Sequence, residues 1–170
     1  MNPITVNITY TSDDLQKAYM LHFNKKLPLK SRRNLFMALA LILIGVFVYF
    51  YDPFNGELNW LCWFFMGYGL ALLVVYYYRL FTIGKRYFKK LPQDKNLFPY
   101  TFSEEGISFQ GEKTSNIIKW EHFQSALITD KIVLLYANEL KFNIFPRRSF
   151  TDTQFEQFTQ LVRQNIANWK

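Results

Sequence analysis

Two apolar stretches decide the fold of this chain: LFMALALILIGVFVYFY at residues 35–51 and LNWLCWFFMGYGLALLVVYYY at residues 58–78. Neither contains a charged residue, and the polar connection Asp52–Glu57 separates them. At a rise of about 1.5 Å per residue, they reach roughly 26 and 32 Å as helices. The hydrocarbon core of a bilayer is about 30 Å thick. The sequence therefore predicts a transmembrane helical hairpin spanning residues 35–81.

The excess positive charge lies beside these stretches. The net charge is +7, yet residues 97–170 hold eight basic and eight acidic side chains. Such a charge distribution is typical of the cytoplasmic ends of a membrane hairpin, whereas a nucleic-acid-binding domain carries its charge in the folded part. We therefore expect both termini in the cytoplasm and no nucleic-acid partner. The basic residues are Lys25, Lys26, Lys30, Arg32 and Arg33 before the hairpin and Arg79, Lys85, Arg86, Lys89 and Lys90 after it.

These basic flanks have two interpretations. They set the orientation of the hairpin and do nothing more, or they also recruit anionic lipid headgroups, at about 1 kcal/mol per basic residue near the surface. Aromatic residues at both ends of the apolar stretches suit the headgroup level of a bilayer. We expect a bilayer with anionic headgroups as one partner of the chain.

Small residues predict how the two helices pack. Gly45 lies in the first stretch, and Gly67 and Ala71 are spaced small-xxx-small in the second, which lets two backbones approach closely. Either closure of the hairpin or contact between two copies would use them, so a homo-oligomer stays open. Neither stretch carries the charged groups that transporters need at membrane depth. The hairpin is therefore interpreted as an anchor, with an oligomeric pore as a further alternative.

The residues before the hairpin, 1–34, predict a cytoplasmic strand and an amphipathic helix. Ile4–Tyr10 alternates apolar and polar side chains, the pattern of a half-buried strand. A lone strand is not stable, so we expect it to join a sheet formed later in the chain. Ser12 is the expected N-cap of the helix, with Asp13 and Asp14 in its first turn. Pro28 ends the helix.

The residues after the hairpin predict a basic linker, 82–96, and one small cytoplasmic domain, 97–170. Short apolar runs separated by turn residues indicate a meander of about six antiparallel strands in the domain. The runs are 100–102, 107–109, 116–120, 126–129, 132–137 and 140–145.

A C-terminal helix follows the predicted strands. Thr151 and Gln154 fit a capping box, and Phe150 with Phe155 fits a hydrophobic staple. Apolar residues then recur on one face of the helix, which must pack on the sheet. These residues are Phe155, Phe158, Val162 and Trp169, with Leu161 and Ile166 beside them.

Several segments are together typical of one family. They are Tyr100–Ile107, Ser115, Ile118 leading to Trp120, the strand pair at Thr129–Tyr136, and Phe145–Phe150 with the helix after it. With the hairpin and the opening strand, they make the chain resemble the YcxB-like membrane proteins of bacteria. The resemblance implies a membrane α-helical hairpin joined to an α+β pleckstrin-homology-like domain, an antiparallel sheet or partial barrel capped by the C-terminal helix. It implies no activity and supplies no catalytic or binding residues.

Catalytic motifs are absent from the sequence. The two histidines, His22 and His122, lie far apart, and the one cysteine, Cys62, lies within the second apolar stretch. No Gly-x-Ser-x-Gly, His-Glu-x-x-His or phosphate-binding glycine loop occurs. We therefore expect no enzymatic activity, no cofactor and no metal site.

Arg147 and Arg148 are the candidate contacts for an anion or a partner. They precede the C-terminal helix, whose free amides and dipole would help them to hold a phosphate or carboxylate. The alternative is a pair of solvated arginines on a surface loop.

The function predicted from these features is non-catalytic. We expect a protein of the bacterial cytoplasmic (inner) membrane that presents its cytoplasmic domain to a protein partner, as an interaction or regulatory module. An immunity protein that neutralises a membrane-acting toxin by binding it is the alternative. A toxin gene beside this gene would favour the immunity protein, and a cytoplasmic or membrane partner would favour the module.

Overall fold

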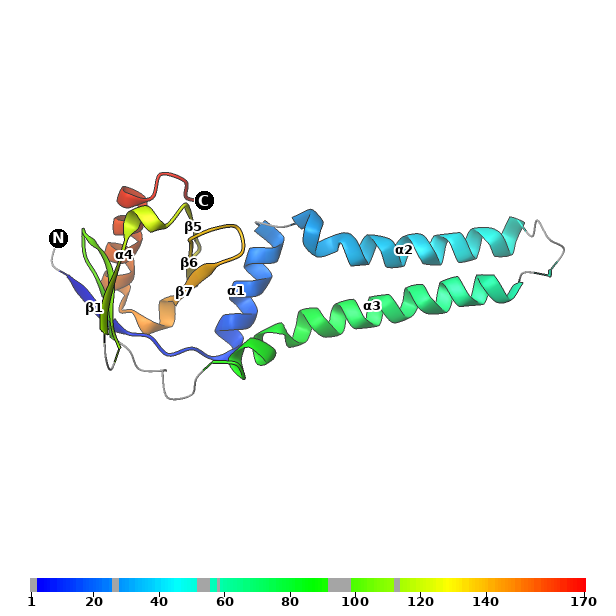
Figure 1. The fold of residues 1–170 in the computed structure, drawn as a ribbon, viewed down its shortest axis with the longest axis horizontal. Coiled ribbons are helices and arrows are strands. Elements are labelled where there is room, and N and C mark those ends of the chain that lie inside the picture. Colours follow the sequence, from blue (N-terminus) through cyan, green and yellow to red (C-terminus); the bar gives the residue numbers. More distant parts are fainter. Residues whose placement is uncertain (1–2, 26–27, 52–55, 58, 92–98, 112–113) are drawn as a thin grey trace. The chain divides into compact units, whose positions relative to one another are not determined.

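The computed structural model divides into two compact units. One contains residues 1–18 and 84–170, and the other contains residues 19–83. The structure describes residues 3–25, 28–51, 56–57, 59–91, 99–111 and 114–170, and Figure 1 shows their helices and strands. We call the first unit the sheet domain and the second the hairpin unit. The sheet domain therefore takes in residues from both sides of the apolar stretches, unlike the predicted domain of residues 97–170.

The hairpin unit is built around two long antiparallel helices. α2 runs from Pro28 to Tyr51 and α3 from Asn59 to Phe88, and the two lie side by side (Figure 1). Pro28 suits the first position of a helix, where the N–H that proline lacks would have no partner. Asp52–Asn55 and Leu58 lie outside the described residues.

The second helix is longer than predicted. It continues ten residues past Tyr78, so residues 82–88 of the predicted linker are helical. Residues 92–96 of that linker lie outside the described residues. Basic residues therefore occupy the last turns of a helix, where their charge favours the negative end of the helix dipole.

The sheet domain contains two antiparallel sheets. The first has the strand order β1-β2-β3-β4 and the second the order β5-β6-β7. The first sheet comprises β1 (Ile4–Asn7), β2 (Pro99–Phe102), β3 (Gly106–Gly111) and β4 (Thr114–Lys119). The second comprises β5 (Ser125–Ile128), β6 (Ile132–Tyr136) and β7 (Phe142–Pro146).

The predicted pairing of the opening strand is confirmed. β1 lies antiparallel to β2, with Ile4 opposite Phe102 and Val6 opposite Tyr100. Ile4, Val6 and Ile8 point into the core and are at most 5% exposed. A strand before the hairpin and a strand after it thus belong to one sheet.

The prediction of a single meander is wrong, although each of its six strands is present. The 3-10 turn η2 (Trp120–His122) follows β4, and β4 and β5 lie in different sheets. Trp120, predicted as the end of a strand, begins this turn. Its indole Nε1–H donates to the carbonyl oxygen of Ser103 at 2.9 Å, which ties the turn to the connection between β2 and β3.

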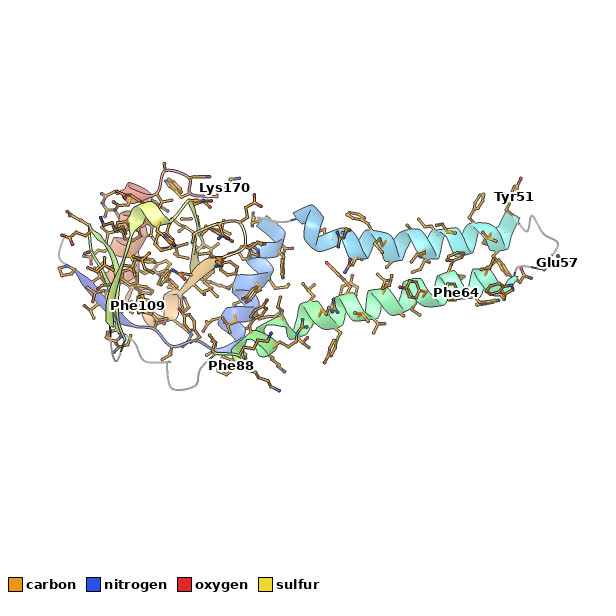
Figure 2. All side chains as sticks on the ribbon, in the orientation of Figure 1. Tyr51, Glu57, Phe64, Phe88, Phe109 and Lys170 are labelled. Atoms are coloured by element: carbon orange, nitrogen blue, oxygen red, sulfur yellow. The ribbon has the colours of Figure 1, made fainter. Side chains whose placement is uncertain are left out.

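Four phenylalanines form the centre of the domain core. Phe102 of β2 and Phe145 of β7 meet Phe150 and Phe158 at the C-terminal helix, α4 (Asp152–Asn165). The ring centroids of Phe102 and Phe158 are 4.4 Å apart, and those of Phe145 and Phe158 are 5.3 Å apart. Figure 2 shows the dense side chains of this unit. The core therefore joins both sheets to α4.

The start of α4 is as predicted. The Thr151 hydroxyl accepts from the backbone N–H of Gln154, and the Gln154 side chain accepts from the N–H of Thr151. The rings of Phe150 and Phe155 lie 5.8 Å apart, as in a hydrophobic staple. Trp169, however, does not lie on this helix, because α4 ends at Asn165 and the chain then turns back to β5.

Candidate functional site

The helices of the hairpin unit meet at two glycines. A Cβ atom on Gly45 would lie 2.7 Å from Cγ of Met66 and 2.9 Å from the carbonyl oxygen of Cys62. A Cβ atom on Gly69 would lie 2.7 Å from Cγ1 of Ile42 and 2.8 Å from the carbonyl oxygen of Ala38. Each glycine thus lets the opposite backbone approach closely, as small residues do in membrane helix pairs.

The predicted packing residues lie in different places, and contact between two copies through those that are exposed stays a prediction. Gly45 is at the contact, but Gly67 and Ala71 are exposed on α3, and a Cβ on Gly67 would meet nothing within 4 Å. The contact within the hairpin repeats every seven residues. The spacing small-x3-large-x2-Gly occurs at Ala38-Ile42-Gly45 and again at Cys62-Met66-Gly69. That repeat was the signal in the sequence.

The outer surfaces of α2 and α3 are apolar and exposed. The segments Arg32–Tyr51 and Asn59–Phe88 are long and apolar enough to cross a membrane, and only 11% of each apolar window is buried. A core helix of a water-soluble domain would be mostly covered by other side chains. Tyr51 and Glu57 lie at the same end of the hairpin (Figure 2).

The basic residues predicted at the membrane surface are mostly exposed. Lys26 lies outside the described residues, and Lys30 lies in α2. The Nζ atom of Lys90 lies 5.7 Å from the centre of the Tyr87 ring. The exposed basic residues are Lys25, Arg32, Arg33, Arg79, Lys85, Arg86, Lys89 and Lys90.

Arg148 joins the domain to the first residues of helix α1 (Ser12–Lys25). Its Nε lies 3.1 and 2.9 Å from the two carboxylate oxygens of Asp14, and its Nη2 lies 2.6 Å from Oδ2. The same Nη2 donates to the carbonyl oxygen of Thr9 at 2.6 Å. These residues are 134 and 139 positions apart in sequence. We call Thr9, Thr11, Asp14 and Arg148 the clasp.

Asp14 also caps α1. Its Oδ2 accepts from the N–H and the hydroxyl of Thr11 at 2.9 and 2.7 Å, and the Thr11 hydroxyl accepts from the N–H of Asp14 at 3.2 Å. The N-cap is therefore Thr11 and not Ser12, because the carbonyl of Thr11 accepts the first helical bond, from Leu15. Thr11 and Asp14 reproduce the capping-box geometry, with Asp in place of Glu or Gln.

The charge of Asp14 is stabilised by the clasp. Burial raises the pKa of this carboxyl group, but the hydrogen bonds from Arg148 and Thr11 and the charge of Arg148 outweigh burial, so its pKa is lowered from 3.8. The residue Asp14 is only 7% exposed, so an unpaired charge on its carboxylate would destabilise the fold.

Two further contacts fix residues before the hairpin to the sheet domain. The hydroxyl of Tyr10 donates to the carbonyl oxygen of Ile144 in β7 at 3.0 Å, and burial, followed by its neighbour Tyr100, raises its pKa. In the last turns of α3, the N–H of Gly84 donates to the side-chain oxygen of Gln16 at 2.8 Å. A Cβ on Gly84 would lie 2.3 Å from the carbonyl oxygen of Ser12, so only glycine permits this crossing of α1 and α3.

Arg147 has partners of its own. Its Nη2 lies 2.8 Å from Oδ1 of Asp152, its Nη1 donates to the carbonyl oxygen of Asp130 at 3.3 Å, and its guanidinium lies 5.3 Å from the centre of the Phe155 ring. The predicted anion contact at Arg147 and Arg148 stays a prediction. Both guanidinium groups are already engaged within the chain, and the capping box satisfies two amides at the start of α4.

An open groove of about 440 Å³ lies at the end of β4. Ile117, Ile118, Lys119, Glu121 and His122 line it, and it brings together the acid and the histidine that are adjacent in sequence. Glu121 and His122 are both exposed. Among the described residues, no group of three His, Cys, Asp or Glu side chains is placed to hold a metal ion.

The structure thus defines a chain with two helices able to cross a membrane, an antiparallel sheet domain and a C-terminal helix. Residues 102–162 match the family model described as YcxB-like protein, so this part of the chain is similar to that family, as its motifs indicated. The match does not include the hairpin or β1, where the resemblance stays a prediction. No curated protein and no solved structure matches the chain significantly.

The family motifs have structural explanations. Gly106, with φ +154°, has no room for a side chain, because a Cβ would lie 2.4 Å from the carbonyl oxygen of Ile118. Trp120 ties η2 to the turn before Gly106. In the segment Phe145–Phe150, Arg148 closes the clasp and Phe150 packs on α4. These residues maintain the fold.

Proposed function

We propose that this chain is a non-catalytic, membrane-anchored interaction protein of the bacterial cytoplasmic membrane. It holds a pleckstrin-homology-like domain at the cytoplasmic surface and presents it to a protein partner. The observation that carries the proposal is the pairing of β1 with β2 across the hairpin.

This pairing supports a topology with both termini on one side. Ile4 and Phe102 lie opposite each other in one sheet, while the two apolar helices separate them in sequence. A folded sheet cannot extend through a bilayer, because backbone groups in lipid must be satisfied within helices or closed barrels. The hairpin must then enter and leave the membrane from the same side. Its exposed basic flanks favour the cytoplasmic side.

The pleckstrin-homology-like assignment is supported by topology. The domain has a four-stranded and a three-stranded antiparallel sheet, followed by one C-terminal helix. In this proposal the two sheets form a partial barrel that the helix caps. In this proposal the hairpin is an insertion between the first and second strands of the fold.

The non-catalytic assignment rests on how the polar groups are used. The buried carboxylate Asp14 is held by Arg148 and Thr11, and the Trp120 indole holds a turn. The hydrogen bonds of these groups therefore stabilise the fold. Recognition through the domain surface is the activity that we propose.

The topology is tested by cysteine labelling in membrane vesicles of known orientation. In a Cys62→Ala background, Glu57→Cys should react with a membrane-impermeant maleimide from the outside. Asn7→Cys and Glu104→Cys, on exposed positions of β1 and of the β2–β3 turn, should react only after the membrane is opened. Labelling of Asn7→Cys and Glu104→Cys from opposite sides would overturn the proposal.

The interaction role is tested by photo-cross-linking in cells. A photoreactive amino acid at Leu140, which is 66% exposed in the sheet domain, should yield a discrete protein adduct that mass spectrometry identifies. The matched position in the hairpin is Phe81, 68% exposed, which should yield lipid adducts. A domain position that never gives a protein adduct contradicts the interaction role.

A further inference from the structure

The residues after α4 attach to the second sheet through an isolated β-bridge and backbone hydrogen bonds to β5. Ile166–Lys170, which we call the tail, runs parallel to β5 with Trp169 beside Ala126. The N–H of Ala126 donates to Asn168 at 2.9 Å, the N–H of Lys170 donates to Ala126 at 3.1 Å, and the N–H of Ile128 donates to Lys170 at 2.8 Å. The C-terminal segment lies near β5 in Figure 1. The tail thus covers the edge of β5 that does not face β6.

The side chains of the tail contribute little to this attachment. Ile166 is 2% exposed, but the four residues after it are exposed. The Trp169 ring remains 45% exposed, with the guanidinium of Arg163 5.0 Å from its centre. One buried side chain, three backbone hydrogen bonds to β5, one backbone hydrogen bond from Ile166 to Val162 and one exposed cation–π contact hold the tail. Segments with so few buried contacts open locally without unfolding of the core.

Detachment of the tail would expose an edge suited to another strand. The backbone N–H groups of Ala126 and Ile128 and the carbonyl of Ala126 would lose their partners. Such a row of groups is a template for an extended segment, with backbone hydrogen bonds giving affinity and side-chain sites giving specificity. The side chains of the tail indicate which segment fits this edge. It has an aliphatic residue at the Ile166 position and, three positions later, an aromatic residue whose ring contacts the guanidinium of Arg163.

We propose that the β5 edge is the docking surface for an extended segment of a protein partner, which displaces the tail. The partner segment runs parallel to β5 and carries an aliphatic residue followed by an aromatic residue at the third position after it. This inference rests on the proposed interaction function and names its surface. A second copy of the chain is a poorer occupant, because its identical tail competes with one already tethered beside the edge at high effective concentration.

The test uses the full chain in detergent and a fluorescent peptide with the sequence of residues 163–170. Removal of Ile166–Lys170, which empties both the Ile166 site and the β5 edge, should raise the affinity for the peptide at least tenfold over the intact chain. Lys170→Pro in the intact chain removes the N–H that the tail donates to Ala126. This variant should raise the affinity for the peptide less than the truncation does. A peptide with Asp at the Ile166 position is the control and should not bind.

A further variant locates the binding at the edge. Ala126→Pro removes an N–H that points to the tail and leaves the pairing of β5 with β6 intact, since Ala126 bonds outward. In the truncated chain this variant should abolish peptide binding, while unchanged circular dichroism shows that the domain is folded.

Three outcomes overturn the inference. They are equal binding by the intact and truncated chains, no binding by a folded truncated chain, and binding that survives Ala126→Pro. Light scattering supplies a fourth: an intact chain that dimerises through tail exchange would assign the edge to a second copy. The photo-cross-linking at Leu140 and the labelling test of topology are independent of all four, so failure of the edge and failure of the proposed function are distinguishable.

Discussion

The hairpin unit and the sheet domain hold their elements together in opposite ways. In the hairpin, the contact is made where side chains are missing, at Gly45 and Gly69, and large apolar side chains point outward. In the domain, large rings such as Phe102 and Phe158 meet in the centre. With the hairpin in a membrane, as proposed, the difference follows from the solvent. Burial of apolar groups stabilises a domain in water, but lipid is as apolar as the side chains, so close backbone approach matters more in a membrane.

The largest effect that tests this comparison is loss of a core ring. Phe158→Ala removes a fully buried side chain that contacts Phe102, Phe145 and Phe150. We expect it to lower the free energy of unfolding of the sheet domain by about 3–5 kcal/mol, the usual cost of a large cavity. Urea unfolding in a fixed detergent, followed by tryptophan fluorescence, measures this change.

The matched control is Phe50→Ala in the hairpin. Phe50 is 81% exposed on α2. Its replacement should therefore change the free energy of unfolding of the hairpin unit by less than about 0.5 kcal/mol. Equal losses for Phe50 and Phe158 would show that the hairpin surface is packed against protein, contrary to the comparison.

The second effect concerns the helix contact. Gly45→Leu places a side chain against Met66 and the backbone of Cys62 and should weaken association of α2 with α3 by about 1–3 kcal/mol, as overpacking does. Gly67→Leu, at an open position of the partner helix, should have little effect. Resistance of the hairpin to unfolding in sodium dodecyl sulfate measures both. A greater loss for Gly67→Leu would place the helix contact where the small-xxx-small spacing predicted it.

The sequence allowed the hairpin to be predicted better than its packing. Apolar length alone defines two spans, because the bilayer sets the length. The contact depends on which face of each helix turns inward, and the four-residue spacing of Gly67 and Ala71 lies on an exposed face of α3. The seven-residue repeat of Ala38 and Gly45 in α2, and of Cys62 and Gly69 in α3, distinguishes the two faces.

The third effect tests the clasp. Arg148→Met leaves the Asp14 carboxylate without its charged partner, and we expect a loss of about 2 kcal/mol in the free energy of unfolding of the sheet domain. Arg147→Met is the matched control and should lower the free energy of unfolding less than Arg148→Met does, because Asp152 is 85% exposed and exposed ion pairs contribute little. Urea unfolding distinguishes the two, and a larger loss for Arg147→Met would contradict the assignment of the clasp.

The clasp and the tail could not be predicted from local patterns. Strands, the capping box at Thr151 and the joining of β1 to the sheet follow from alternation and short spacings. The pairing of Asp14 with Arg148 joins residues 134 positions apart, and one sequence offers many such acid and base pairs. The two-sheet division depends on η2, where Trp120 turns inward to bond Ser103, a long-range contact that β-propensity does not encode.

The smallest effect is a dependence on pH that only an intact clasp produces. The pKa of Asp14 is lowered in the folded chain from its ordinary value of 3.8, so below that value the unfolded chain binds the proton more readily. The stability that the ionised carboxylate contributes is therefore complete above about pH 3.8 and is lost as the pH falls through the lower, folded pKa. The difference in unfolding free energy between the wild type and Arg148→Met should accordingly narrow below pH 3.8.

Urea midpoints at pH 7, 5, 4 and 3 measure this difference. Arg147→Met is the control, because its difference from the wild type does not involve Asp14. A difference for Arg148→Met that stays constant to pH 3 would mean that packing of the arginine, and not the charge of Asp14, stabilises the contact.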